Sequence, residues 1–299
     1  MERRGFIKSS SLAGIGLFPG FTSIAQEKSQ AAKPFNLSYA FHDGMFSNHA
    51  GKDFIDQIKF AHDQGFNAIE DNGMMSRTPE MQSKIGDTLA KLGMRMGVFV
   101  ITSDNWHWKT SLATGKQEFK DLIVKDCTRA IEVAKRCNAK WATVVPGNYD
   151  RSLPADIQMA NVIEGLRLGT AVLEKAGLVM VLEPLSDNPD LFLRHSTQTY
   201  MVCKAVNSPS CKILFDMYHM QRNEGNIIAN LDRCWDEIGY IQIGDNPGRN
   251  EPTTGEMNYK NIFKHIHSTK KGIVTIETEG SHMLHTDKKI DLISCFAML

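Results

Sequence analysis

The chain has 299 residues, of which 42% are hydrophobic and 23% are charged, as expected for a globular protein that can bury one full core. Its 34 Lys and Arg residues balance 34 Asp and Glu residues. Since no basic stripe stands out either, no nucleic-acid partner is expected. After the N-terminal segment, no apolar stretch approaches the roughly 20 residues of a membrane-spanning helix.

The first residues have the features of an export signal. Arg3 and Arg4 precede a short, weakly apolar stretch that ends in small residues around Ala25, a plausible cleavage site. The paired arginines resemble a twin-arginine signal, and an ordinary secretory signal with two arginines is the alternative. We expect residues 1–25 to be this signal and 26–34 to be a linker. The mature protein is then exported, to the periplasm by the twin-arginine route.

Beyond the linker, short apolar runs alternate with longer amphipathic ones. Strands are predicted at residues 36–41, 68–70, 94–100, 142–145, 178–183, 212–216, 240–243 and 273–277. Helices are predicted at residues 52–64, 79–92, 116–137, 155–176, 196–206, 226–234, 259–269 and 288–298. Eightfold alternation favours a single α/β domain, a closed (β/α)8 TIM barrel of parallel strands over residues 35–299. No Gly-x-Gly-x-x-Gly follows the first strand, which argues against an open dinucleotide-binding sheet.

Four consecutive predicted strands end in a hard oxygen ligand. These residues are Glu183, Asp216, Gln242 and Glu277. Each follows an apolar run, where an ionised acid is costly unless it is paired or bound to a cation. Neighbouring strands lie about 4.8 Å apart, so the four ends converge in a closed barrel. They suit Mg²⁺ or Mn²⁺ better than zinc, although any one of them alone could be a capping or ion-paired group.

The segments that hold these residues resemble those of the hydroxypyruvate isomerase family, within the xylose-isomerase-like sugar isomerase and epimerase barrels. The similar segments are Glu183-Pro184-Leu185-Ser186, Asp216 to Gln221, Gln242 to Tyr259 and Gly272 to Glu277. The resemblance implies that Glu183, Asp216, Gln242 and Glu277 bind a divalent metal. It also implies that Glu183 and Glu277 form the catalytic acid–base pair.

Several nearby residues are candidates for substrate binding. In the family a histidine and an arginine at the positions of His219 and Arg249 contact substrate oxygens or a carboxylate. Arg249 can hold a carboxylate bidentately; the alternative is an ion pair with Glu251 or Glu256. Glu251 lies in the same polar loop, and His219 alternatively contacts a metal-binding carboxylate. Trp108 follows the third strand. Its ring could stack on a sugar face as one wall of the site; the alternative is that it belongs to a packed loop.

Two polar residues follow the first two strands at the same end of the barrel. His42 follows the first strand and Glu70 ends the second. From the sequence we expect them only to line the pocket.

The resemblance implies a metal-dependent isomerase of a small hydroxy-keto substrate, of the hydroxypyruvate to tartronate semialdehyde type. The reaction removes a proton beside a carbonyl and passes through an enediolate. The alternatives are a sugar epimerase or 3-keto-sugar lyase with the same metal site, or a non-catalytic carbohydrate-binding barrel. The expected partner is a small keto acid or sugar, and a homo-oligomer remains possible. Export argues for a substrate other than a phosphorylated metabolite.

Overall fold

The chain divides into two units, Met1–Gln30 and Ala31–Leu299. A computed structural model describes residues 35, 37–101, 111–269 and 277–280, all within the second unit. The predicted signal and linker, Trp108 and the predicted last helix at 288–298 lie outside the described residues.

Among the described residues, eight parallel strands form one sheet in the order β3-β2-β1-β8-β7-β6-β5-β4. They are β1 Ser38–His42, β2 Ala68–Glu70, β3 Arg95–Met96, β4 Trp141–Val144, β5 Val179–Leu182, β6 Cys211–Asp216, β7 Ile238–Ile243 and β8 Glu277–Gly280. Strands β1 and β8, the first and the last along the chain, pair with each other. This order is that of a (β/α)8 barrel numbered around its ring.

The segment after β3 joins the two ends of that order. Val100 forms a parallel bridge with Thr143 of β4. The Thr143 N–H donates to the Phe99 carbonyl at 2.7 Å, and the Ile101 N–H donates to the Thr143 carbonyl at 3.1 Å. These bonds continue the ladder from β3 to β4, and the predicted (β/α)8 barrel is confirmed.

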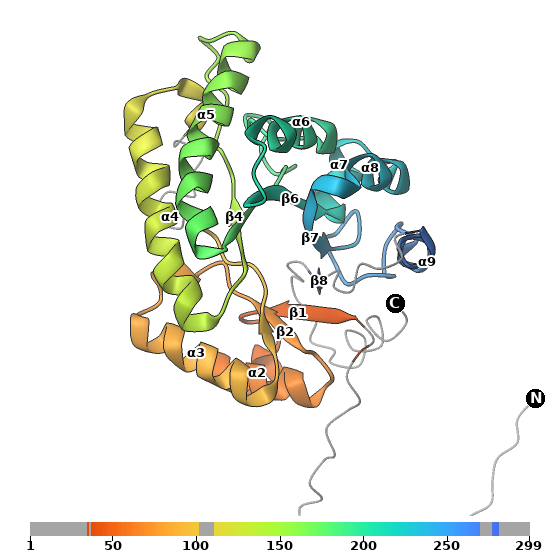
Figure 1. Cartoon of the computed structure of the whole chain (residues 1–299). Helices are drawn as coiled ribbons and strands as arrows, with labels where there is room; N and C mark the ends of the chain where they lie inside the picture. The colour runs from red at the N-terminus through yellow and green to blue at the C-terminus, as the bar shows by residue number, and fades with distance from the viewer. Residues whose placement is uncertain (1–34, 36, 102–110, 270–276, 281–299) are drawn as a thin grey trace, which may run out of the picture. The chain divides into compact units, whose positions relative to one another are not determined.

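Helices lie around the outside of the strands (Figure 1). The α-helices are α1 Ser47–Ala50, α2 Phe54–Asp63, α3 Pro79–Leu92, α4 Gln117–Cys137, α5 Ala155–Leu173, α6 Ser196–Val206, α7 Met217–Asn223, α8 Ile227–Cys234 and α9 Tyr259–Thr269. Short 3₁₀ turns are Met74–Ser76, Leu112–Thr114, Glu174–Ala176 and Trp235–Glu237. Local sequence sets their ends: the Thr78 side chain caps α3, Pro79 occupies its first turn, and Gly93 closes it in the left-handed conformation.

Strand residues separate into two packed layers. Most buried apolar residues, including those on the outward faces of the strands, form one core with the helices. A second, smaller cluster consists of Val98, Val181, Leu214 and Tyr240. These four belong to the strands or to the segment after β3, and they fill the interior of the barrel. Alternation along the strand then places Glu183, Asp216 and Gln242, two residues further on, on the same inward face.

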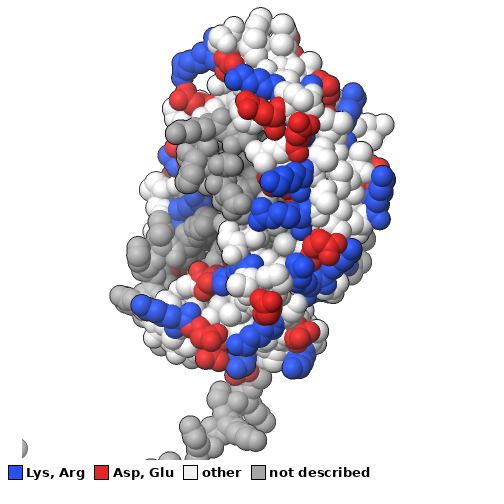
Figure 2. Space-filling model, turned by 90° about the vertical axis from the view of Figure 1, so that its left-hand side faces the viewer, with Lys and Arg blue, Asp and Glu red and all other residues white. Residues whose placement is uncertain are grey.

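The part of the chain that the structure describes holds no helix long and apolar enough to cross a bilayer. On the face in Figure 2, Lys and Arg residues are interspersed with Asp and Glu residues. Positive and negative side chains are thus mixed on that face, which shows no large area of a single charge.

Candidate metal centre and active site

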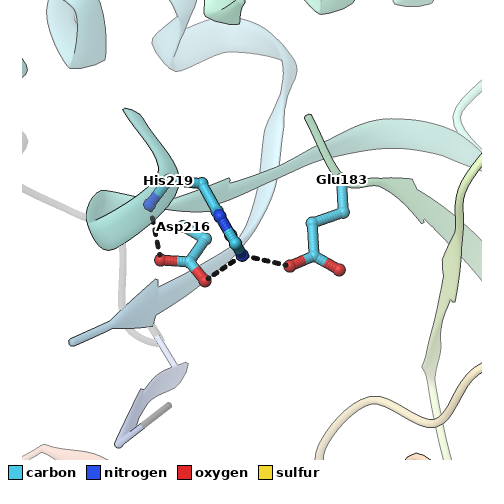
Figure 3. A group of neighbouring side chains, drawn as sticks. All are labelled: Glu183, Asp216 and His219. Atoms are coloured by element: carbon cyan, nitrogen blue, oxygen red, sulfur yellow. Dashed lines mark hydrogen bonds and ion pairs between the residues drawn. The ribbon is translucent and has the colours of Figure 1, made fainter. Parts of the chain in front are cut away.

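The C-terminal ends of β5, β6 and β7 bring buried polar groups together inside the barrel. Glu183, Asp216 and Gln242 are all less than 9% exposed. The register pairs Asp216 with Gln242 on neighbouring strands. Single ligand atoms of Glu183, Asp216 and His219 lie within 4.8 Å of one another, a group that could hold a metal ion. Figure 3 shows the His219 ring between the two carboxylates.

The two oxygens of Asp216 have different environments. Its Oδ1 accepts hydrogen bonds from the N–H groups of Tyr218 at 2.8 Å and His219 at 3.4 Å, and so caps α7. Its Oδ2 is buried with no hydrogen-bond partner among the described residues. A buried carboxylate oxygen without a hydrogen bond costs free energy unless a cation lies close to it, and Arg249 Nη2 approaches Oδ2 only to 3.8 Å. Helix capping therefore fixes the carboxylate and leaves one oxygen available as a ligand.

Glu183 faces the same space. Burial raises the pKa of Glu183 well above its ordinary value, and the nearby Asp216 carboxylate adds to this shift. Two buried carboxylates without a cation oppose each other's ionisation, whereas a divalent ion between them would favour it. The donors, two carboxylates with an amide and an imidazole nearby, fit a divalent cation such as Mg²⁺ or Mn²⁺.

His219 is held by the turn after β5. Its Nδ1 lies 3.2 Å from the Ser186 N–H and 2.8 Å from the Ser186 hydroxyl. Since a backbone N–H can only donate, Nδ1 is the acceptor of the Ser186 N–H. Nε2 lies 3.6 Å from Asp216 Oδ2 and 3.7 Å from Glu183 Oε1. Burial lowers the pKa of His219, which favours the neutral ring over the charged one.

Arg249 places its guanidinium at the edge of the same group. Its Nη2 lies 3.2 Å from His219 Nε2 and 3.8 Å from Asp216 Oδ2. Its Nη1 lies 3.8 Å from Asp187 Oδ2, and the guanidinium stacks on the Tyr218 ring at 4.9 Å. Among the described residues, its ion pairs are therefore with Asp216 and Asp187, not with the Glu251 or Glu256 considered from the sequence.

The loop after β7 carries Arg249 and is fixed by Asp245. Asp245 Oδ1 accepts from the Met257 N–H at 3.0 Å, and Oδ2 accepts from the Thr253 N–H at 2.8 Å. The Asp245 N–H donates to the Asn250 carbonyl at 2.8 Å. Glu251 in this loop is 4% exposed, and its Oε1 has no hydrogen-bond partner among the described residues. These bonds fix the loop, which places Arg249 beside Asp216 and His219 and holds a buried acid, Glu251.

Glu70 and His42 belong to the site more closely than the sequence indicates. Gln242 Nε2 donates to both oxygens of Glu70, at 3.1 and 3.0 Å. His42 Nε2 lies 2.6 Å from Glu70 Oε2. Glu70 is fully buried, and burial lowers the pKa of His42 to about 4. The available signal was an acid directly after the apolar pair Ala68-Ile69. Asp187, which follows the Glu183 turn, was not predicted.

Two predicted site residues are not described in side-chain detail. Strand β8 begins at Glu277, where the sequence analysis expected a strand to end, and residues 273–276 of that expected strand lie outside the described residues. The register pairs Gln242 with Glu279, so position 277 lies two residues before that level. Trp108 also lies outside the described residues.

The sequence profile described as "Xylose isomerase-like TIM barrel" matches residues 58–293. The chain belongs to this family. It is 32% identical to the hydroxypyruvate isomerase of Escherichia coli K12 over 156 residues, 52% of this chain and 59% of that protein, less than two thirds of its length. It is 26% identical to the 2-oxo-tetronate isomerase of Cupriavidus necator over 226 residues, 74% of this chain and 83% of that protein. The resemblance inferred from the motifs is confirmed.

Solved structures show the same fold. A family 2 AP endonuclease from Brucella melitensis has a TM-score of 0.76 at 19% identity, covering 87% of this chain and 98% of that one. A 3-keto-D-glucoside 4-epimerase from E. coli has a TM-score of 0.71 at 17% identity, with the same coverage. At such identities the likeness concerns the fold alone, and the site must carry the functional argument.

Proposed function

We propose that this protein is a divalent-metal-dependent isomerase of a small hydroxy-keto substrate, of the hydroxypyruvate to tartronate semialdehyde type. The observation that carries the proposal is the buried Glu183–Asp216 pair with Asp216 Oδ2 lacking a hydrogen-bond partner among the described residues. The relatives named hydroxypyruvate and 2-oxo-tetronate isomerases support the same class of reaction.

Glu183, Asp216, Gln242 and Glu277 would hold the metal. Donors of this kind suit Mg²⁺ or Mn²⁺, and the bound cation would supply Lewis-acid stabilisation of negative charge on the substrate oxygens. The capping of α7 by Asp216 Oδ1 keeps its carboxylate in place whether or not the ion is present.

Glu183 is the candidate base for the proton beside the carbonyl. Its buried carboxylate lies beside Asp216 and His219 at the candidate metal centre, so it is held next to the place where the substrate would bind. Glu277 is the proposed second member of the acid–base pair, acting on the other face of the planar enediolate.

Arg249 is the proposed binding group for a substrate carboxylate. Its planar guanidinium stacks on Tyr218 and lies beside His219, so one edge of its fork is oriented toward the site. His219, with its Nε2 lying between the two carboxylates, is placed to contact a substrate oxygen. Glu251 and Trp108 remain proposed substrate contacts.

A substrate panel on metal-reconstituted protein in D₂O tests the function. Hydroxypyruvate, 2-oxo-tetronate, free ketoses and 3-keto glycosides are each incubated, and NMR reports deuterium incorporation at carbon. We expect metal-dependent exchange and isomerisation with the small keto acids. Exchange confined to the sugars would instead establish the epimerase or lyase alternative, and no exchange with any compound would favour the carbohydrate-binding barrel.

Variants assign the groups. Glu183→Gln and Glu277→Gln preserve side-chain volume but remove the base, so each should lower turnover about 10²-fold or more. Asp216→Ala should act through metal loss and recover partly in excess metal. Glu237→Gln, a buried carboxylate paired with Lys212 at the opposite end of β7, is the matched control. Near-normal turnover in both catalytic glutamine variants would contradict the proposed mechanism.

A further inference from the structure

The amide of Gln242 is held from across the barrel. Gln242 lies on β7 and Glu70 at the end of β2, 172 positions apart in the chain. Both oxygens of Glu70 accept hydrogen bonds from the Gln242 amide nitrogen, at 3.1 and 3.0 Å. Both side chains are buried, at 0% exposure for Glu70 and 6% for Gln242.

The chemistry of the two groups fixes the orientation of the amide. An ionised carboxylate only accepts hydrogen bonds, while a primary amide has one donating nitrogen and one accepting oxygen. Only the nitrogen of Gln242 can therefore face Glu70, and its Oε1 must point away from it. Turning the amide over would set its oxygen against two carboxylate oxygens in a buried place, which is strongly unfavourable.

A glutamine ligand needs this control more than an acidic ligand does. A carboxylate offers two equivalent oxygens, so rotation by half a turn leaves it able to bind a cation. An amide offers one oxygen, and the same rotation presents an N–H₂ group to the ion. His42 Nε2 lies 2.6 Å from Glu70 Oε2, which in turn restrains the carboxylate that holds the amide.

We propose that Glu70 is a positioning residue for the metal site, which fixes the Gln242 amide so that its oxygen is available as a ligand. The inference rests on the proposed metal-dependent function. It assigns a purpose to a buried acid that does not belong to the four candidate ligands. Its consequence is that loss of the Glu70 carboxylate weakens cation binding although every candidate ligand is retained.

Equilibrium Mn²⁺ binding to the full-length protein, measured by calorimetric titration, tests the proposal independently of turnover. Glu70→Gln should weaken Mn²⁺ affinity about 10- to 100-fold, because the new amide can pair with either end of Gln242. The exchange variant Glu70→Gln with Gln242→Glu should recover most of the affinity. In that variant the ligand is a carboxylate that needs no orientation, and the amide introduced at position 70 can donate to it. Glu237→Gln is the control and should bind as the wild type does.

The outcomes separate the proposals. Wild-type affinity in Glu70→Gln, or a loss that the exchange variant does not recover, would overturn the positioning role while leaving the proposed function intact. If the wild-type protein binds no Mn²⁺, both the proposed function and this inference fail. If Glu70→Gln does not fold by circular dichroism, the exchange variant decides: near wild-type affinity supports the role, and weak binding overturns it.

Discussion

Arg249 shows how one residue links backbone conformation to the chemistry of the site. Its φ of 57° lies in the left-handed region, which residues other than glycine adopt at a cost. In return its guanidinium lies over Tyr218 and beside His219 and Asp216. Arg222 contacts the same Tyr218 ring at 5.5 Å but is far more exposed. The left-handed backbone at Arg249 therefore serves to place its guanidinium close to the buried acid Asp216.

Replacing Arg249 by lysine should reveal this use. Arg249→Lys keeps the charge but loses the planar fork, so KM for a keto-acid substrate should rise about tenfold or more, with a smaller change in kcat. Steady-state kinetics measure both constants. Arg222→Lys is the matched control and should leave KM within about twofold. An equal effect of the two substitutions would show that Arg249 has no special part in substrate binding.

The loop between β7 and α9 is the element that carries Arg249 to the site. Asp245 receives two backbone N–H groups from its far end, and the Tyr259 hydroxyl donates to the Gly244 carbonyl at 2.7 Å. The closure is so tight that a Cβ placed on Gly255 would lie 2.0 Å from the Asn246 carbonyl oxygen and 2.6 Å from Asp245 Oδ1. Only glycine permits this approach.

Gly255→Ala should therefore displace the loop without unfolding the barrel. We expect kcat/KM to fall at least tenfold, since Arg249 and Glu251 move with the loop, while overpacking lowers stability by about 1–3 kcal/mol. Kinetics and thermal unfolding measure the two effects. Gly73→Ala is the control, because its added Cβ would come no closer than 3.4 Å to a neighbouring atom. Unchanged activity in Gly255→Ala would mean that the loop tolerates movement.

At the scale of the whole molecule, the alternation of apolar runs and amphipathic helices predicted the barrel. The inward positions of Glu183, Asp216 and Gln242 followed from the same pattern, because each comes at the end of a buried strand. The Glu70–Gln242 contact and the ion pair of Arg249 with Asp187 could not be predicted. Both join segments far apart in the chain, and they depend on how the ring closes. Strand β3 is shorter than predicted because its continuation pairs with β4 only through a bridge at Val100.

Export of the whole chain is a separate prediction. Arg3→Lys together with Arg4→Lys should block export by the twin-arginine route and leave the folded barrel unchanged, because these residues lie outside the unit Ala31–Leu299 that contains the barrel. Cell fractionation locates the protein, and circular dichroism checks its fold. Arg151→Lys, at a highly exposed arginine of the barrel, is the control. Unchanged export of the double variant would exclude the twin-arginine route.

The hydrogen bonds between residues 70 and 242 also set an order of events during synthesis. Glu70 is made early, but Gln242 is added to the nascent chain only after about four fifths of the polypeptide has been made. A contact of such long sequence separation carries a loop-closure cost, and it cannot form before residue 242 has been made. A cation that needs both groups in place would therefore enter after translation has passed this point. Metal loading would then mark a chain whose ring of strands is complete, and truncated chains would remain empty.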